Sequence, residues 1–205
     1  MRILGVLLTA TVIFLTGCSD SPKTQTAKKE EPKKEPEAIT GKSAFFKVYV
    51  TARSWASDVQ CLSVSNIPLA EVKAGPGKSG AWRVTVFSPS KLRKRSYTWS
   101  AVEAEGNLHE GVFPGPEESV NPNNITRPFL IAAIKTDTDT ALKVAEGKSA
   151  EYMKRNPGMR INYLLELGDK HPNPAWRVIW GDSVGTSGHS VFVDSVTGDY
   201  LETRH

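Results

Sequence analysis

Apolar and polar residues alternate along the last thirty residues of the chain. Residues 176–180 read Trp-Arg-Val-Ile-Trp, with the two-residue period of a strand that buries one face. A Gly/Ser-rich stretch follows at residues 181–188, and the alternation restarts at residues 191–193. Gly198 predicts a tight turn, because glycine adopts positive φ without steric cost. The pattern predicts a hairpin followed by a short third strand.

The rest of the chain shows helical and strand periods in turn. Apolar residues from Phe45 to Val59 recur at steps of three and four, which predicts one helix with Ser43 as its cap. Residues 137–146 and 149–155 predict two shorter helices joined at Gly147. Strands are expected at residues 64–72, 81–87, 97–102 and 161–167. These elements predict an α+β fold.

Two short words occur twice in the chain. Gly-Lys-Ser-Ala stands at residues 41–44 and 147–150, and Ala-Trp-Arg-Val stands at residues 81–84 and 175–178. We interpret them as a degenerate tandem repeat of two units, residues 42–120 and 129–205, each a helix packed on a small antiparallel sheet. Chance matching of two four-letter words is the alternative.

The first residues predict export and lipid anchoring. Arg2 precedes an apolar run from Ile3 to Leu15, which is shorter than the roughly 20 residues that span a bilayer. Leu15-Thr16-Gly17-Cys18 resembles the bacterial lipobox, so residues 1–17 are expected to be a signal peptide cleaved before an acylated Cys18. The chain would then be a membrane-anchored envelope lipoprotein, facing the periplasm from the outer membrane if the host has one.

The segment after Cys18 changes composition. Residues 18–41 are rich in Lys, Glu and Pro and nearly free of apolar side chains, which predicts a disordered tether. Removing residues 1–17 deletes only Arg2 among charged residues and lowers the net charge from +4 to +3. This charge is too small to indicate nucleic-acid binding.

The C-terminal stretch resembles a known family. Trp-x-Val at residues 176–178, followed by Val-x-Val-Asp-x-x-Thr-Gly-Asp-Tyr-Leu at residues 191–201, looks like the closing strands of a PepSY domain. That resemblance implies a helix before a small antiparallel sheet. It also implies restraint of peptidases or a part in envelope assembly. Residues 105–107 read Glu-Gly-Asn where the second half has Thr-Gly-Asp, so the first half departs from the pattern.

Candidate chemistry is sparse. Gly-Lys-Ser lacks the upstream glycine of a phosphate loop, the four histidines share no metal-ligand spacing, and Cys61 is expected to be a small buried residue. Asp137 is interpreted as a helix cap rather than a calcium ligand. No catalytic residue, metal site or cofactor is predicted.

Two sets of surface residues are candidates for interaction. Arg93, Lys94 and Arg95 belong to a basic cluster expected at a hairpin tip, where it would lie in solvent or contact anionic lipid. Trp99 and Trp180 are candidate surface platforms. We expect a non-enzymatic binding or modulating role, with the membrane and an envelope protein or peptidase as partners. A carbohydrate- or peptidoglycan-binding module and a small hydrolase are the alternatives.

Overall fold

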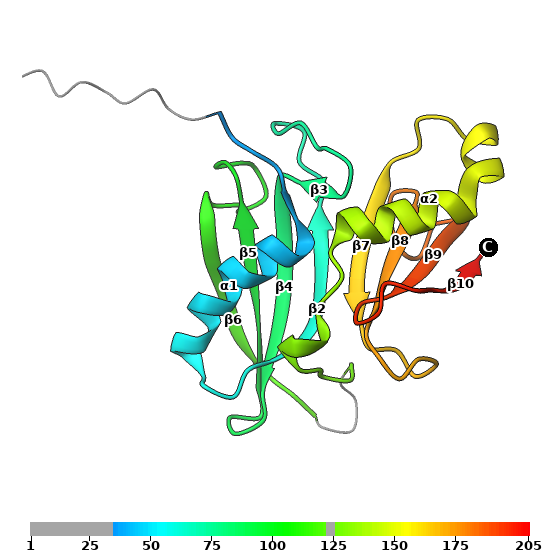
Figure 1. The fold of residues 1–205 in the computed structure, drawn as a ribbon. Helices are drawn as coiled ribbons and strands as arrows, with labels where there is room; N and C mark the ends of the chain where they lie inside the picture. The colour runs from blue at the N-terminus through cyan, green and yellow to red at the C-terminus, as the bar shows by residue number, and fades with distance from the viewer. Residues whose placement is uncertain (1–34, 122–125) are drawn as a thin grey trace, which may run out of the picture. The chain divides into compact units, whose positions relative to one another are not determined.

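An eight-stranded antiparallel sheet and two helices dominate residues 35–121 and 126–205, the part of the chain that the computed structural model describes (Figure 1). The α+β class is therefore as the sequence predicts. The helices are α1 (Gly41–Trp55) and α2 (Thr138–Arg155). The strands of the sheet are β2 (Gln60–Ile67), β4 (Ala81–Ser88), β5 (Arg93–Ser100), β6 (Gly111–Ser119), β7 (Ile161–Glu166), β8 (Ala175–Trp180), β9 (His189–Asp194) and β10 (Tyr200–Arg204). Short elements are β1 (Ile39–Thr40), β3 (Lys78–Ser79) and the 3-10 turn η1 (Ile131–Ala133).

The sheet order is β10-β9-β8-β7-β2-β4-β5-β6. Read outward from the central β7–β2 pair, each half is a run of four strands in chain order. The central pairing is short, from Ser63↔Glu166 to Ser65↔Leu164. Beyond it the strands part: Asn66 accepts the backbone N–H of Tyr163 at 2.7 Å with its side-chain oxygen, in place of a ladder hydrogen bond.

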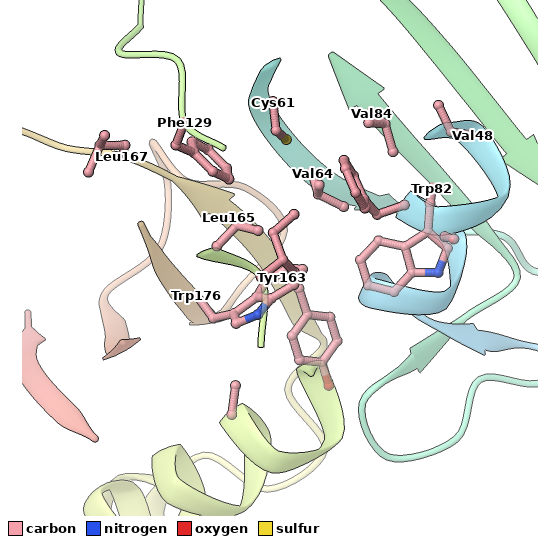
Figure 2. Close-up of a cluster of buried hydrophobic side chains, with 14 of the residues drawn as sticks. Val48, Cys61, Val64, Trp82, Val84, Phe129, Tyr163, Leu165, Leu167 and Trp176 are labelled. Carbon is pink, nitrogen blue, oxygen red and sulfur yellow. The ribbon is translucent and has the colours of Figure 1, made fainter. Parts of the chain in front are cut away.

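Both helices lie on one face of the sheet. α1 packs on β4 and β5, and α2 packs on β8 and β9. Cross-strand partners share a face, and the buried pairs Val64↔Val84, Val64↔Leu165 and Leu165↔Trp176 continue one apolar layer across the centre. A single core therefore runs under both helices (Figure 2).

The two helices begin next to each other. Asp137 caps α2, as expected, because its Oδ1 accepts the N–H of Thr138 at 2.7 Å. The same oxygen accepts the N–H of Lys42 in the first turn of α1 at 3.0 Å. The hydroxyl of Thr138 accepts the N–H of Gly41 at 3.0 Å. One carboxylate thus serves the N-termini of both helices.

Two expectations about the helices and one about the tether are wrong in detail. The N-cap of α1 is Thr40, whose side chain accepts the N–H of Ser43, so Ser43 lies in the first turn. The two pieces expected around Gly147 form the single helix α2, because a glycine inside a helix costs only about 1 kcal/mol and buried Ala145 and Ser149 lie on either side of it. The ordered chain also starts before residue 42, since β1 pairs with β3.

The two Ala-Trp-Arg-Val segments occupy equivalent places in the two halves of the fold, whereas the two Gly-Lys-Ser-Ala segments do not. The indole Nε1 of Trp82 donates to the carbonyl of Ile39 at 3.0 Å, and that of Trp176 donates to the carbonyl of Thr136 at 2.9 Å. Each acceptor lies two residues before a helix. By contrast, Gly41 begins α1 while Gly147 lies inside α2. A tandem origin of the halves stays a prediction.

The turn that carries the PepSY resemblance is held by Asp194. Burial acts to raise the pKa of its carboxyl, but hydrogen bonds from the Asn173 side chain and from the N–H groups of Thr197 and Val196 outweigh it and hold the pKa below the usual value. Gly198 has φ of +82°, as the turn predicts. The Asp of this motif therefore fixes the turn.

Candidate functional site: the uncovered face of the sheet

The sheet has a second face, opposite the helices, that no helix of the described chain covers. Every second side chain of each strand points to this face, because successive side chains of a strand point to opposite faces of the sheet. We call this the uncovered face. Its side chains include Ser63, Ser65, Arg83, Thr85, Ser96, Thr98, Phe113, Leu164, Glu166, Arg177 and Phe192.

One row of this face runs from β6 to β9, and Glu202 of β10 continues it beside Phe192. The strand register places Phe113, Thr98, Arg83, Ser65, Leu164, Arg177 and Phe192 side by side in that order. Arg83 and Arg177 follow the two corresponding tryptophans and stand on either side of the β2–β7 pair. The row thus presents two guanidinium groups with hydroxyl and apolar neighbours.

The two arginines differ in their surroundings. Arg177 is half-buried, donates from Nε to the Ser190 hydroxyl at 3.0 Å and lies over the Phe192 ring at 5.3 Å. Burial, followed by the nearby Arg204, lowers the pKa of Arg177. Arg83 is exposed, and within residues 35–121 and 126–205 it has neither an ion pair nor a hydrogen-bond partner. Arg83 is the arginine available to a ligand.

A hollow lies over each half of the uncovered face. The first, which we call the Arg83 hollow, is lined by Arg83, Ser96, Thr98, Gly106, Asn107, Leu108, Phe113, Pro114, Gly115 and Pro116. The second, which we call the Arg204 hollow, is lined by Glu166, Gly168, Asp169, Lys170, His171, Ala175, Phe192 and Arg204. In the part of the chain that the structure describes, no acidic residue lines the Arg83 hollow, whereas the Arg204 hollow has both signs of charge.

The basic residues of the Arg204 hollow share one acidic partner, Glu202. Arg204 bonds to Glu202, and His171 Nε2 lies 3.4 Å from the same carboxylate oxygen. The hydrogen bond from Arg204 is the main reason that the pKa of Glu202 is lowered. Arg204 also lies 4.2 Å over the Phe192 ring. A His–carboxylate pair is present here, but the lining holds no Ser, Thr or Cys nucleophile.

The predicted basic cluster does not form a free tip. The hairpin turn occupies residues 89–92, and Arg93, Lys94 and Arg95 lie within β5. Lys94 makes a 3.0 Å ion pair with Glu118 of β6, and Arg95 donates to the carbonyl of Gly115 at 2.8 Å. Cross-strand acids on β6 thus offset part of the positive charge, a pairing that the sequence spacing does not reveal.

The expectation that Trp99 and Trp180 are surface platforms is wrong. Trp99 is 7% exposed and Trp180 is 2% exposed. Both point to the helix face: Trp99 pairs across the strands with Trp82, and the ring of Trp180 meets the edge of the His189 ring at 5.2 Å. The basis for a tryptophan-lined sugar site is therefore lost.

A buried polar cluster joins three segments far apart in the sequence. The Ser149 hydroxyl lies 2.8 Å from His189 Nε2, and His189 Nδ1 lies 3.3 Å from His205 Nδ1. The Tyr152 ring stacks on the His189 ring with 4.1 Å between centroids. Burial, followed by His205, lowers the pKa of His189. Sequence spacing carries no signal for this cluster, because α2, β9 and the C-terminus bring it together.

This cluster has two parts of a Ser–His site and lacks the rest. Ser149 and His189 are 2% and 3% exposed, so a substrate carbonyl cannot reach the hydroxyl. The second imidazole nitrogen faces another imidazole, where a triad needs a carboxylate. The geometry is that of a satisfied core hydrogen bond.

The remaining site expectations divide between described and undescribed residues. Cys61 is fully buried, which raises the pKa of its thiol. Across the described residues no group of His, Cys, Asp and Glu is arranged to hold a metal ion. No helix in that part of the chain is long and apolar enough to cross a membrane. Cys18, the predicted signal peptide and most of the predicted tether lie outside the described residues.

Comparison of the chain with known protein families, with curated proteins and with solved structures finds no match. The PepSY resemblance therefore rests on the C-terminal residues alone and stays a proposal.

Proposed function

We propose that this chain is a non-enzymatic binding protein of the cell envelope, anchored to a membrane through acylated Cys18. The observation that carries the proposal is the uncovered face. Both helices lie on the other side of the sheet, and the row from Phe113 to Arg177 offers cationic, hydroxyl and apolar groups together. Mixed polar and apolar composition is typical of non-obligate interfaces.

The absence of accessible catalytic geometry among the described residues supports a binding role over the hydrolase alternative. The Ser149–His189 pair is buried, and the His171–Glu202 pair has no nucleophile among the residues that line its hollow. The PepSY resemblance adds that the partner is a peptidase to be restrained or a protein of envelope assembly. Carbohydrate binding loses its support with the burial of Trp99 and Trp180.

A co-purification experiment tests this function. The full chain, extracted with detergent from its own membranes, serves as bait in wild-type form and as two variants. Thr85→Trp places a bulky ring on the uncovered face, and Lys47→Trp places the same ring on the exposed side of α1. We expect the bound protein, identified by mass spectrometry, to be lost with Thr85→Trp and kept with Lys47→Trp.

The identity of the captured protein then separates the two implied roles. A peptidase whose activity falls when the bait is added indicates restraint, and an assembly factor indicates a structural role. Loss of the partner with Lys47→Trp alone would overturn the proposal, because it would place the binding surface on the helices.

A further inference from the structure

The Arg83 hollow combines an unneutralised cation with hydroxyl groups. Arg83 is its one charged lining residue, and among the described residues its guanidinium has no partner. Thr98 is the direct cross-strand neighbour of Arg83. Ser96 also lines the hollow, and its hydroxyl lies 3.0 Å from that of Thr85.

These groups match a carboxylate better than a neutral ligand. A guanidinium presents a planar fork of N–H donors that binds both oxygens of a carboxylate at once. The neighbouring hydroxyls can satisfy the lone pairs that the fork leaves open. None of the described residues that line the hollow is acidic, so none of them repels an anion or competes for Arg83.

An apolar wall stands beside the cation. Phe113 is 41% exposed, and its ring is held against His109 with 4.3 Å between centroids. Leu108 and the prolines at positions 114 and 116 complete the wall. The hollow measures about 290 Å³. Sites for whole drug-sized ligands span about 300–1,000 Å³, so this hollow has room for about one residue of a longer ligand.

We propose that the Arg83 hollow binds the C-terminal residue of a partner peptide, with its α-carboxylate on Arg83 and an apolar side chain against Phe113. This inference rests on the proposed function, because it names what part of the partner is recognised. Only a terminal residue carries a carboxylate and an apolar side chain on the same Cα. In an internal Asp or Glu the side chain is itself the carboxylate, and the wall is left without an occupant.

Fluorescence anisotropy with the full chain in detergent tests the inference. The probe is a fluorescein-labelled peptide, Gly-Ser-Gly-Ala-Phe, with a free C-terminus, and its match is the same peptide with a C-terminal amide. We expect the amide to bind about tenfold more weakly, the size of one charge-assisted contact at a partly exposed site. Arg83→Gln is expected to remove the difference between the peptides, and Arg53→Gln, an exposed arginine of α1, to retain it.

Two further measurements show whether the carboxylate must belong to a peptide and whether the planar guanidinium of Arg83 is needed. 3-Phenylpropionate is expected to compete far more weakly than the peptide, and Arg83→Lys is expected to bind with intermediate affinity because it keeps charge but not the fork. Equal binding of acid and amide by the folded wild-type chain, or equal competition by the small acid, overturns the inference. If the peptide measurements overturn the inference but Thr85→Trp still abolishes co-purification of the partner, the proposed function stands and only this subsite is wrong.

Discussion

Gly41 lies against the indole of Trp176, with the indole of Trp82 beside it. A Cβ atom at position 41 would approach Cη2 of Trp176 to 2.6 Å and Cη2 of Trp82 to 3.0 Å. The start of α1 thus sits on the two tryptophans that anchor the two halves of the sheet. This contact, together with Asp137, ties both helix N-termini to the same point of the core.

Gly41→Ala is predicted to destabilise the fold. The added methyl group overpacks a site closed by two rigid rings, which typically costs about 1–3 kcal/mol. The matched control is Gly147→Ala, because Gly147 lies inside α2 and a Cβ atom there would have no neighbour within 4 Å. That change should stabilise by about 0.5–1 kcal/mol through helix propensity. Urea unfolding of both variants should therefore shift in opposite directions.

Trp82→Ala and Trp176→Ala are each predicted to lose about 3–5 kcal/mol of unfolding free energy. Each change empties a fully buried site and leaves the carbonyl of Ile39 or Thr136 without its indole donor. The total free energy of unfolding of a domain this size is roughly 5–15 kcal/mol, so both variants should melt at a much lower temperature. Arg83→Ala, on the same strand as Trp82 but exposed, should melt like the wild type. Equal melting of the three variants would show that the core assignment is wrong.

The fold is predicted to lose stability in mild acid because of His189. Burial and His205 lower the pKa of His189 in the folded state below the ordinary 6.5, so the unfolded chain binds a proton more readily. This contribution is fully present above pH 6.5 and declines as the pH falls below that value towards the folded pKa. The slope of unfolding free energy against pH should be positive in this range.

His189→Gln is expected to flatten that slope, since glutamine does not titrate. His109→Gln, which changes a histidine that bonds to Glu103 on the surface, should leave the slope in place. An unchanged slope in His189→Gln would assign the acid sensitivity to another group.

Membrane anchoring is predicted to depend on the Cys18 sulfur. Cys18→Ser should release the protein from the membrane fraction while residues 35–205 keep their near-ultraviolet circular dichroism. Mass spectrometry of the mature N-terminus should find an acylated Cys18 as the first residue. An uncut signal or an unmodified Cys18 would contradict the lipoprotein prediction.

Local patterns in the sequence predict which helices and strands form better than they predict the residues at which these elements begin and end. The alternation around Trp176 and the positive φ of Gly198 follow from local rules. The helix start is misassigned because Thr40 and Ser43 are both good caps and only tertiary contacts choose between them. Gly147 does not break α2, because buried Ala145 and Ser149 hold the helix on both sides of it.

The candidate site is less accessible to sequence reasoning than the fold. Alternation shows that Arg83 and Arg177 oppose their tryptophans, but only the pairing of β2 with β7 puts them in one row. The burial of Trp180 follows from alternation, which places it on the same face as Trp176, whereas that of Trp99 follows from its cross-strand pairing with buried Trp82. The Ser149–His189 contact joins residues 40 positions apart, and no spacing rule applies to it.

The most direct test of the account is site-specific photo-crosslinking of the full chain in living cells. A photoreactive amino acid is placed at Ser65 or Thr85 on the uncovered face, and at Lys47 or Glu151 on the exposed sides of the helices. If the uncovered face is the binding surface, both positions on it should crosslink to the same partner, and the two helix positions should not. Crosslinks to a common partner from Lys47 and Glu151, with none from Ser65 and Thr85, would contradict the central claim.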